Sequence, residues 1–248
     1  MIAGIFHQGS GLGNQLFRYV ATRVLALDKG YEFGMGNPHL FKGYEFMKLD
    51  MGIPTEIVSA DLKRFNEKKI VENGVDIRSY DPEINFVEDN TIIDGELQDE
   101  RYFGHRMKEI NKWLKVELMN LPNDLCVIGF RGGEYSIFPD LFLTQSYWNN
   151  AIGEMRKVNP QMKFKVVTDD PLTARGFFPD FEITHEIGSD WRHVRYARYL
   201  IIANSSFYIL PALLNENVQK VIAPRYWARR NTKVWALPQN YYSKFLYI

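Results

Sequence analysis

The sequence predicts an α/β fold built on mostly parallel strands. Short apolar runs alternate with segments of helical period, a glycine turn joins the first run to the first helix, and the same pattern begins again in the second half. This alternation is typical of strands that are connected by helices across a sheet. In chain order the segments read "MIAGIF", "NQLFRYVATRVLALDK", "LCVIGF", "SYWNNAIGEMRKV", "KFKVVT", "RYLIIANSS", "SFYILPALL" and "VQKVIAP".

The first strand comes from "MIAGIF" and the first helix from residues 14–29. On that helix Leu16, Tyr19, Val20, Val24 and Leu27 recur at helical spacing, so we expect one face to pack on a sheet. The stretch 36–90 mixes scattered charges with turn residues and predicts no clear element.

A seam is predicted at "MNLPND", residues 119–124, where a long helix should end in a Pro/Asn/Asp turn. Strand and helix patterns resume beyond it, in the order that a second α/β unit requires. We therefore predict two Rossmann-like lobes, residues 1–121 and 122–248, that face each other across a cleft.

The composition limits the class of protein. The 248 residues are 46% hydrophobic, which is enough for a sizeable core, and 30 basic residues balance 30 acidic ones. We expect neither a nucleic acid nor an anionic membrane as the main partner. The single cysteine, Cys126, excludes an internal disulfide framework and is expected to be a small buried residue. With no signal sequence and no run of about 18 apolar residues, we expect a soluble, cytoplasmic protein without stable membrane insertion. The oligomeric state is left open.

The turn "GSGLGNQLF" offers a possible anion site. Backbone N–H groups at a helix start, together with the helix dipole, favour an anion above a glycine turn. The glycines Gly9, Gly11 and Gly13 have neither dinucleotide nor P-loop spacing. Asn14 and Gln15 add uncharged donors that suit hydroxyl groups or phosphate oxygens. The alternative, that Asn14 only caps the helix, is equally compatible with the residues.

The stretch "VIGFRGGEY" places Arg131 after a buried strand, at the edge of a sheet where open α/β folds bind ligands. The planar donors of an arginine can meet two oxygens of a diphosphate at once. A surface salt bridge with Glu134 is the alternative, and the glycines between the two residues argue against it because they let a ligand approach the backbone.

Two further strands end in polar residues. Asp169 and Asp170 follow "KFKVVT", and one of the two suits the cap of the next helix because a proline comes next. They could also accept hydrogen bonds from a nucleobase or sugar, whereas a metal would need further oxygen ligands. Asn204, Ser205 and Ser206 follow "RYLIIA" where another helix begins, and they can either bind phosphate or cap that helix.

These stretches, in this order, resemble the α-1,2-fucosyltransferases of glycosyltransferase family 11. Members of that family carry "GGLGNQLFQYA", "GYFQSEKYF", "HxRRGDY", "SDDPxW", "NSSFSWWGAWL" and "APxxWF". This chain has "GSGLGNQLFRYV", "DGELQDERYF", "GFRGGEY", "TDDPL", "IIANSSFYILPALL" and "APRYW", the last at 223–227. The six blocks are collinear and span nearly the whole chain.

Two departures bear on the donor. Gly129 stands where the family has the histidine of "HxRRGDY", and Gly132 stands where it has the second arginine. In related fucosyltransferases that histidine lies at the guanine and the first arginine, here Arg131, at the β-phosphate. The phosphate role is therefore retained, and the guanine role is open. The segment 209–213, "ILPAL", also replaces "WWGAW".

The resemblance implies a GT-B-type fold and a metal-independent, inverting transfer of L-fucose from GDP-fucose to an acceptor glycan, in a single displacement. The implied linkage is α-1,2 to a galactoside-like acceptor. Its donor-binding residues are Gly11, Gly13, Asn14, Gln15, Arg131, Asp169, Asp170, Asn204, Ser205, Ser206 and Phe207. By resemblance Arg131 also stabilises the leaving phosphate, Asn14 lies near the diphosphate and sugar, and Phe207 contacts the base.

The general base is open among Glu134, Asp140 and the acidic group Glu96, Asp99 and Glu100. Glu100 matches the acid of the "SEKYF" block and Glu134 that of the "GDY" block. Three alternatives to a fucosyltransferase remain: a transferase for another nucleotide sugar, a non-catalytic sugar- or nucleotide-binding homologue, and a nicotinamide oxidoreductase, against which the glycine spacing argues.

Overall fold

The computed structural model describes residues 1–53, 62–72, 75–226 and 242–248, and the side chains of 70–77 lie outside this description. The described residues form two compact units, unit 1 over 1–115 and unit 2 from 116 onward. Each unit contains a parallel sheet with helices, so the predicted α/β fold is confirmed. Residue 227, which ends the "APRYW" block, lies outside the described residues.

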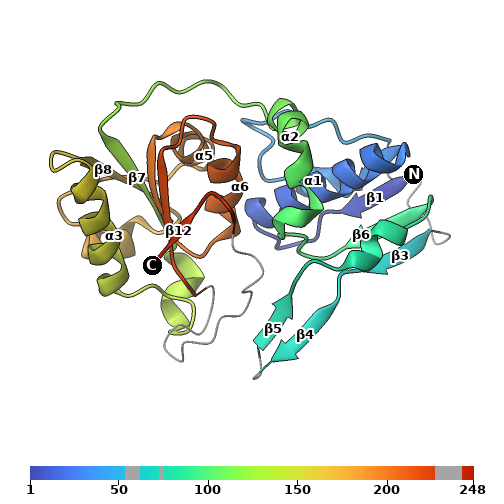
Figure 1. Cartoon of the computed structure of the whole chain (residues 1–248), viewed down its shortest axis with the longest axis horizontal. Coiled ribbons are helices and arrows are strands. Elements are labelled where there is room, and N and C mark those ends of the chain that lie inside the picture. The colour runs from blue at the N-terminus through green and yellow to red at the C-terminus, as the bar shows by residue number, and fades with distance from the viewer. Residues whose placement is uncertain (54–61, 73–74, 227–241) are drawn as a thin grey trace. The chain divides into compact units, whose positions relative to one another are not determined.

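Unit 1 is built on a four-stranded sheet in the order β2-β1-β6-β3, and every pair in it is parallel. Its strands are β1 (Ile2–Ile5), β2 (Phe33–Gly36), β3 (Lys63–Asn66) and β6 (Thr91–Asp94). A separate antiparallel hairpin of β4 (Lys69–Glu72) and β5 (Val75–Arg78) extends from this unit (Figure 1). The stretch 36–90, which the sequence left unassigned, therefore supplies one strand of the sheet and the hairpin.

Helix α1 (Leu12–Lys29) lies along β1 and β2 (Figure 1) and is buried on more than one face. It ends at Gly30, whose left-handed conformation lets its N–H reach the carbonyls of Ala26 and Leu27. Four of the five residues predicted to face the sheet are buried, but Leu27, in the last turn of the helix, is 46% exposed.

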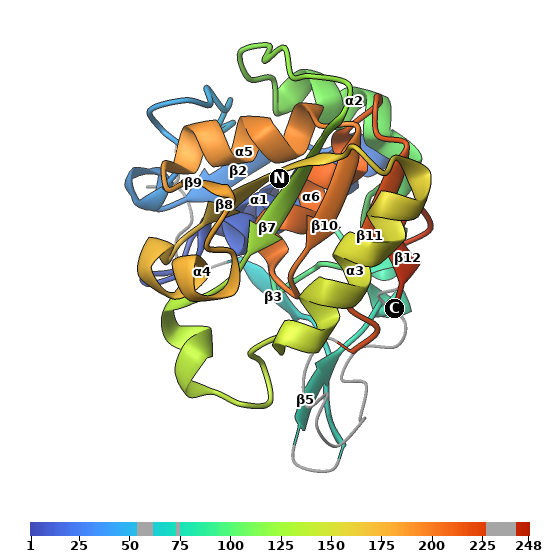
Figure 2. The same cartoon turned by 90° about the vertical axis from the view of Figure 1, so that its left-hand side faces the viewer.

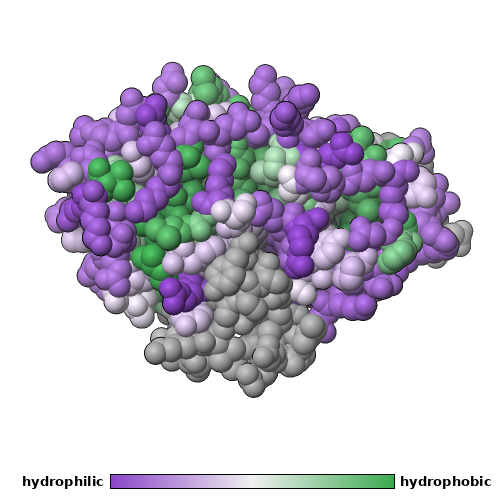
Figure 3. Space-filling view, in the orientation of Figure 1, coloured by the Kyte–Doolittle hydropathy of each residue, from purple (hydrophilic) through white to green (hydrophobic). Residues whose placement is uncertain are grey.

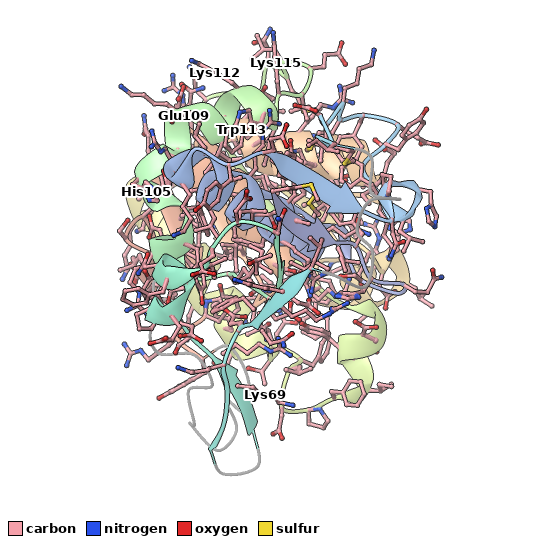
Figure 4. All side chains as sticks on the ribbon, turned by 90° about the vertical axis from the view of Figure 1, so that its right-hand side faces the viewer. Lys69, His105, Glu109, Lys112, Trp113 and Lys115 are labelled. Atoms are coloured by element: carbon pink, nitrogen blue, oxygen red, sulfur yellow. The ribbon has the colours of Figure 1, made fainter. Side chains whose placement is uncertain are left out.

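The chain between β6 and unit 2 contains only short helices. They are η4 (Glu100–Tyr102), η5 (Gly104–Arg106) and α2 (Met107–Trp113). The predicted long helix before residue 119 is therefore wrong, since residues 114–122 are not helical. Helix α2 is joined to α1 by Arg23, whose guanidinium carbon lies 4.4 Å from the ring centroid of Trp113. Lys112 and Lys115 are exposed and project outward (Figure 4).

Unit 2 is built on a six-stranded sheet in the order β12-β11-β10-β7-β8-β9, again with all pairs parallel. Its strands are β7 (Leu125–Phe130), β8 (Lys163–Thr168), β9 (Glu182–Thr184), β10 (Tyr199–Ile202), β11 (Lys220–Ala223) and β12 (Leu246–Tyr247). The chain runs from β7 to one edge and then returns beside β7 as β10. This is the strand order of a doubly wound fold, and its direction reverses between β7 and β10.

Helices cover both faces of this sheet (Figure 2). They are α3 (Gln145–Val158), α4 (Pro171–Phe177), α5 (Ile187–Tyr196) and α6 (Ser206–Leu214). In Figure 2, α3 lies on the near side of the sheet and α5 and α6, which pack on each other, lie behind it. Phe130, at the end of β7, packs its ring against Trp148, Phe177 and Phe178. Cys126 is fully buried in β7, as predicted.

On the face drawn in Figure 3, hydrophilic residues cover most of the surface and hydrophobic ones show through in smaller areas. None of the described helices combines the length and the hydropathy that a bilayer span requires.

Gly129, near the end of β7, lies against the ring of Tyr208 on α6. A Cβ atom at Gly129 would lie only 2.7–2.9 Å from three ring carbons. Tyr208 is 2% exposed, and its hydroxyl donates a hydrogen bond to the carbonyl of Phe130 (2.7 Å) and also lies 3.3 Å from that of Val167. The ring is thus fixed at both ends, and the strand residue beneath it must be glycine.

We predict that Gly129→Ala lowers the free energy of unfolding by about 1–3 kcal/mol, because the added methyl group overpacks a rigid aromatic contact. Gly153→Ala, in α3, is the control, since a Cβ there meets nothing within 4 Å. A helix-interior alanine should raise stability by about 0.5–1 kcal/mol. Urea unfolding of the two variants measures both effects, and a Gly129→Ala protein as stable as wild type would contradict the packing argument.

Candidate functional site

The candidate site in unit 2 lies at the carboxyl ends of β7 and β10, where the strand order reverses. Gly129 of β7 pairs with Ile202 of β10, so the two strands end at the same level. Arg131 follows β7, and Asn204 and Ser205 follow β10. Open α/β sheets bind ligands in the crevice at this kind of position. Two of the sequence-predicted stretches are thereby brought to one place in the fold.

The Arg131 guanidinium is held by two carboxylates. Its Nη1 lies 2.6 Å from Asp169 Oδ2 and its Nη2 donates to Glu134 Oε1 at 2.8 Å. Burial alone would lower the pKa of Arg131, but the charge of Asp169 and the hydrogen bond to Glu134 raise it, so the group stays cationic. Its Nε is buried and has no partner among the described residues. The salt bridge with Glu134 that the sequence offered as an alternative is present.

Gly132 and Gly133 allow the loop after β7 to approach Asp169 and Asp170, which follow β8. The N–H of Gly132 donates to Asp169 Oδ1 (2.9 Å) and that of Gly133 donates to Asp170 Oδ2 (3.2 Å). Gly133 has a φ of 42°, and a Cβ there would lie 2.5 Å from Asp169 Oδ2. Both glycines are therefore needed for the contact between the β7 and β8 loops.

Asp170 caps α4, as predicted. Its Oδ1 accepts a hydrogen bond from the N–H of Thr173 at 3.0 Å, and Pro171 occupies the first turn. Hydrogen bonds from the Thr173 hydroxyl and N–H are the main reason that the pKa of Asp170 is lowered. Asp169 and Asp170 were both predicted to bind the donor, but in the structure each carboxylate is committed to holding a neighbouring loop or helix.

Helix α6 begins beside Arg131's strand, with Ser205 at the N-cap. The Ser205 side chain makes no capping hydrogen bond, so simple capping does not account for it. Asn204 is 1% exposed and its Nδ2 donates to the carbonyl of Leu141 at 3.1 Å. Phe207 is half-buried against Trp191, with ring centroids 5.8 Å apart. The first N–H groups of a helix have no intrahelical acceptor, and here they begin with Ser206 at the ligand-binding edge.

Gly129 and Tyr208 are matched in volume. The ring of Tyr208 covers the Cα of Gly129, and a larger side chain at position 129, such as a histidine, would collide with this ring.

In unit 1 the residues of the glycine turn, 9–15, differ in their burial and in their hydrogen-bond partners. Gly11, not Asn14, is the N-cap of α1, so the capping interpretation of Asn14 is wrong. Gln15 is 1% exposed; its Nε2 donates to the carbonyl of Leu40 (2.7 Å) and its Oε1 accepts from the N–H of Lys42 (3.0 Å). Both ends of the Gln15 amide are therefore hydrogen-bonded to the backbone of the loop after β2, and binding a donor through this side chain would require these bonds to break. Gly13 is buried in the first turn, and the space around Gly11 is open.

Asn14 belongs to a polar cluster that sequence reasoning missed. Its Oδ1 accepts a hydrogen bond from Gln98 Nε2 at 3.1 Å. Nearby, His7 Nε2 lies 2.9 Å from Asp94 Oδ1, and Arg18 Nε lies 3.7 Å from the same oxygen. His7 follows β1 and Asp94 ends β6, so the pairing of these two strands brings the cluster together. The sequence does not show which strands pair, and for this reason the cluster was not predicted. Glu100 lies half-buried in η4, outside the contacts described for this cluster.

Other parts of the described chain are less suited to chemistry. No group of three or more His, Cys, Asp or Glu side chains within the described ranges is arranged to hold a metal ion. A pocket of about 550 Å³ lies at the opposite, amino end of the unit 2 strands, lined in part by Leu125, Lys163 and Glu182. It lies away from the loops that carry Arg131 and Asn204.

Asp190 on α5 is a buried carboxylate near the candidate site. It is 4% exposed, and its Oδ1 accepts a hydrogen bond from the Thr184 hydroxyl at 2.9 Å. Burial raises its pKa to about 6, although hydrogen bonds from Thr184 and from the N–H of Glu186 oppose the shift. The native state therefore holds this proton more tightly than the unfolded chain does.

We predict that Asp190 contributes a component to the free energy of unfolding that is lost as pH rises from about 4 to about 7, and that Asp190→Asn removes this component. A rise of about two pKa units corresponds to about 3 kcal/mol lost across that window. Urea unfolding at several pH values measures the difference between wild type and Asp190→Asn. Asp180→Asn, at an exposed aspartate of the same unit, is the control. Parallel curves for wild type and Asp190→Asn would contradict the prediction.

Comparisons with known proteins give a match in structure alone. No family model matches the sequence, and no curated protein matches it. The α-1,6-fucosyltransferase NodZ from Bradyrhizobium, in a crystal soaked with GDP-fucose, is similar with a TM-score of 0.51 and 13% identity over 88% of this chain and 93% of that one. The E. coli heptosyltransferase WaaC with ADP-2-deoxy-2-fluoro heptose has a TM-score of 0.51 and 12% identity over 100% of this chain and 93% of that one. The chain therefore has a GT-B-like α/β fold with two parallel sheets.

Proposed function

We propose that this protein is an inverting glycosyltransferase that transfers a sugar from a nucleoside diphosphate to a hydroxyl group of an acceptor glycan. The observation that carries the proposal is Arg131, a half-buried cation at the point where the strand order reverses, next to the N-terminus of α6. A guanidinium and a helix N-terminus at the carboxyl edge of a sheet together suit a diphosphate. The GT-B-like fold supports the same class of enzyme.

In the proposed reaction the acceptor oxygen attacks the anomeric carbon while the bond to the β-phosphate breaks. Negative charge grows on the leaving diphosphate, and preorganised donors that stabilise such charge are commonly worth about 10²–10³ in rate each. Arg131 and the N–H groups at the start of α6 are the donors we assign. The resemblance adds Asn14 as a further donor to the diphosphate and sugar.

A diphosphate at Arg131 would replace a carboxylate that is already there. Glu134 is the partner that can leave, because its side chain is 66% exposed and exposed ion pairs contribute only about 0–1 kcal/mol. Asp169 is held more firmly, since it also accepts the N–H of Gly132. We therefore assign Asp169 to the orientation of Arg131, and Glu134 to an exchange between Arg131 and solvent when the donor binds.

GDP-fucose is the donor we propose, on the six sequence blocks shared with the α-1,2-fucosyltransferases. The second candidate is another nucleotide sugar, and a specific contact favours it: Tyr208 closes the space over Gly129, where the family places its guanine-contacting histidine. A nucleotide sugar with a base other than guanine would not depend on a contact with that histidine. Sugar transfer by NodZ and by WaaC, which the fold resembles, uses different sugars, so the fold is compatible with either.

Calorimetric titration with GDP-fucose, GDP-mannose, a UDP-sugar, an ADP-sugar and GDP alone tests the donor. We expect GDP-fucose to bind wild type and the affinity to fall about 10–100-fold in Arg131→Ala, since hydrogen bonds to a charged group contribute about 1.5–3 kcal/mol. Arg156→Ala is the matched control, because Arg156 lines the pocket at the amino end of the same sheet.

The outcomes separate the alternatives. Selective binding of a UDP- or ADP-sugar with the same dependence on Arg131 would establish the second candidate. Equal affinities of wild type and Arg131→Ala would contradict the assignment of Arg131 to the diphosphate. If a nucleotide sugar binds but no diphosphate is released with any acceptor glycan, the protein is a binding homologue and not an enzyme.

A further inference from the structure

The polar cluster in unit 1 lies where two parallel strands end side by side. Strands β1 and β6 are paired, with Ile2 opposite Thr91, so their carboxyl ends meet at one edge of the sheet. His7 follows β1 and Asp94 ends β6. Carboxyl ends of parallel strands are the usual position of ligand-binding side chains in such sheets. Nothing in the donor assignment uses this edge except Asn14.

The contact between His7 and Asp94 selects one state of the imidazole ring. Nε2 of His7 lies 2.9 Å from Asp94 Oδ1, and an ionised carboxylate can only accept a hydrogen bond. The proton of the neutral ring is therefore on Nε2, and Nδ1 carries a free lone pair. The His7 side chain is 46% exposed, and Nδ1 has no partner among the described residues. A base with this geometry can take a proton from a bound hydroxyl group.

Asp94 is kept ionised by its surroundings. Burial alone would raise its pKa, but the hydrogen bond and charge of His7 and the charge of Arg18 lower it. Arg18 comes from α1, Asp94 from β6 and Glu96 from the loop after β6, and they meet His7 at this edge. Glu67, which follows β3, and Arg78, which ends β5, also act on Arg18 through their charges. A carboxylate that stays ionised also stabilises the imidazolium that forms when His7 takes a proton.

Arg18 offers a donor that the protein itself does not use. Its side chain is only 6% exposed; Nε donates to the carbonyl of Gly95 at 3.1 Å, while Nη1 is buried without a partner among the described residues. A buried N–H group without an acceptor costs about 1–3 kcal/mol, so such groups in native proteins call for an explanation. Arg18 acts at this edge chiefly through its charge, which lowers the pKa of Asp94.

The loop that carries Glu96 and Gln98 is held in a strained conformation. Leu97, between them, is fully buried with a φ of 50°, a conformation that costs a bulky residue about 1–3 kcal/mol. The buried carboxylate of Glu67 keeps it there by accepting the N–H groups of Glu96 (2.8 Å) and Leu97 (3.1 Å). As a result Gln98 Nε2 spans Asn14 Oδ1 and Glu96 Oε2, at 3.1 and 3.3 Å.

We propose that this edge is the acceptor site and that His7 Nδ1 is the general base, with Asp94 as its positioning residue. The inference rests on the proposed glycosyltransferase function and deepens it. The acceptor hydroxyl gives its proton to His7 Nδ1, its oxygen forms the new bond to the anomeric carbon, and the electron pair of the broken C–O bond leaves with the nucleoside diphosphate. The imidazolium then releases the proton to solvent.

The substrate class that fits this edge is a neutral glycan with several adjacent hydroxyl groups. The amides of Asn14 and Gln98 place both donor and acceptor groups next to His7 and Asp94. Hydroxyl groups, which both donate and accept, match such a mixture. A carboxylate or phosphate on the acceptor would instead face Asp94 and Glu96, so we expect acidic glycans to be poor acceptors.

The test uses His7→Gln and Asp94→Asn in the full chain, with His105→Gln as the matched control. His105 forms a second His–Asp pair in unit 1, with Nε2 2.6 Å from Asp28 Oδ2 and 51% exposure, on the side of the unit where α2 lies (Figure 4). We expect kcat for transfer to lactose, a neutral galactoside, to fall about 10²–10⁴-fold in His7→Gln, as is typical for loss of a general base. The acidic limb of the pH–rate profile should disappear as well.

Asp94→Asn should lower kcat at least about tenfold and leave an acidic limb in the profile, because it removes the partner of the base and not the base. Transfer by His105→Gln should remain within about twofold of wild type. A His7→Gln variant with more than half of the wild-type kcat, or one that keeps the acidic limb, would overturn the proposal.

Two further readouts separate this proposal from the donor assignment. Nucleotide-sugar affinity should be unchanged in His7→Gln, whereas a failed donor assignment shows itself as an absence of binding in wild type. Nitrogen NMR of the His7 ring, which needs no turnover, should report a proton on Nε2 in wild type. In Asp94→Asn the ring should no longer prefer Nε2 over Nδ1 as the protonated nitrogen. The acceptor site would be contradicted if the neutral ring were protonated on Nδ1. It would also be contradicted if none of a panel of neutral mono- and disaccharides shifted the His7 signals, even where the donor binds.

Discussion

The pairing of β7 with β10 is the constraint from which the candidate donor site follows. It places two strands that are distant in sequence at the centre of one sheet, with their ends level. The loop after β7 then carries Arg131, and α6 begins after the neighbouring strand β10, with Ser205 as its N-cap. Gly129 makes the arrangement possible, because only a residue without a Cβ lets Tyr208 seal the strand against α6. The packing of Gly129 against Tyr208 in the core thus lies two residues from Arg131 at the edge of the sheet.

Charge at this edge is balanced before any ligand arrives. Arg131 is paired with Asp169 and Glu134, and Asp169 and Asp170 are in turn occupied by the N–H groups of two glycines. Such pairing neutralises the half-buried guanidinium of Arg131. A ligand therefore gains from Arg131 only by exchange with Glu134, the one of the two carboxylates that is mostly exposed.

The unit 1 edge contains two features that cost stability. Among the described residues, Arg18 keeps a buried N–H group unpaired and Leu97 keeps an unfavourable backbone conformation. Both cost stability, and the buried carboxylate of Glu67 opposes the second by binding two N–H groups of the strained loop. Arg131 in unit 2 likewise keeps a buried Nε without a partner among the described residues, so each edge has one arginine N–H group that the described side chains leave unpaired.

Much of the fold was predictable because it depends on local patterns. The strands at 125–130 and 163–168 and the helix at 206–214 appear as expected, since a short apolar run bounded by turn residues has few other solutions. The cap at Asp170 followed from the proline after it. The long helix before residue 119 was wrong, because helical periodicity there continued beyond the point where packing on α1 ends, at Trp113.

The sequence by itself determined the α/β class, the positions of the polar residues after each strand, and the resemblance that suggests a sugar donor. Only the tertiary structure decided that Asp169 and Asp170 serve the loop of Arg131, that Gln15 clamps the segment at 40–42, and that His7 meets Asp94. The physical reason is strand order. Hydrogen bonds within a helix or a cap join near neighbours in the chain, whereas the partners of His7 and Arg131 lie 87 and 38 residues away and are set by which strands pair.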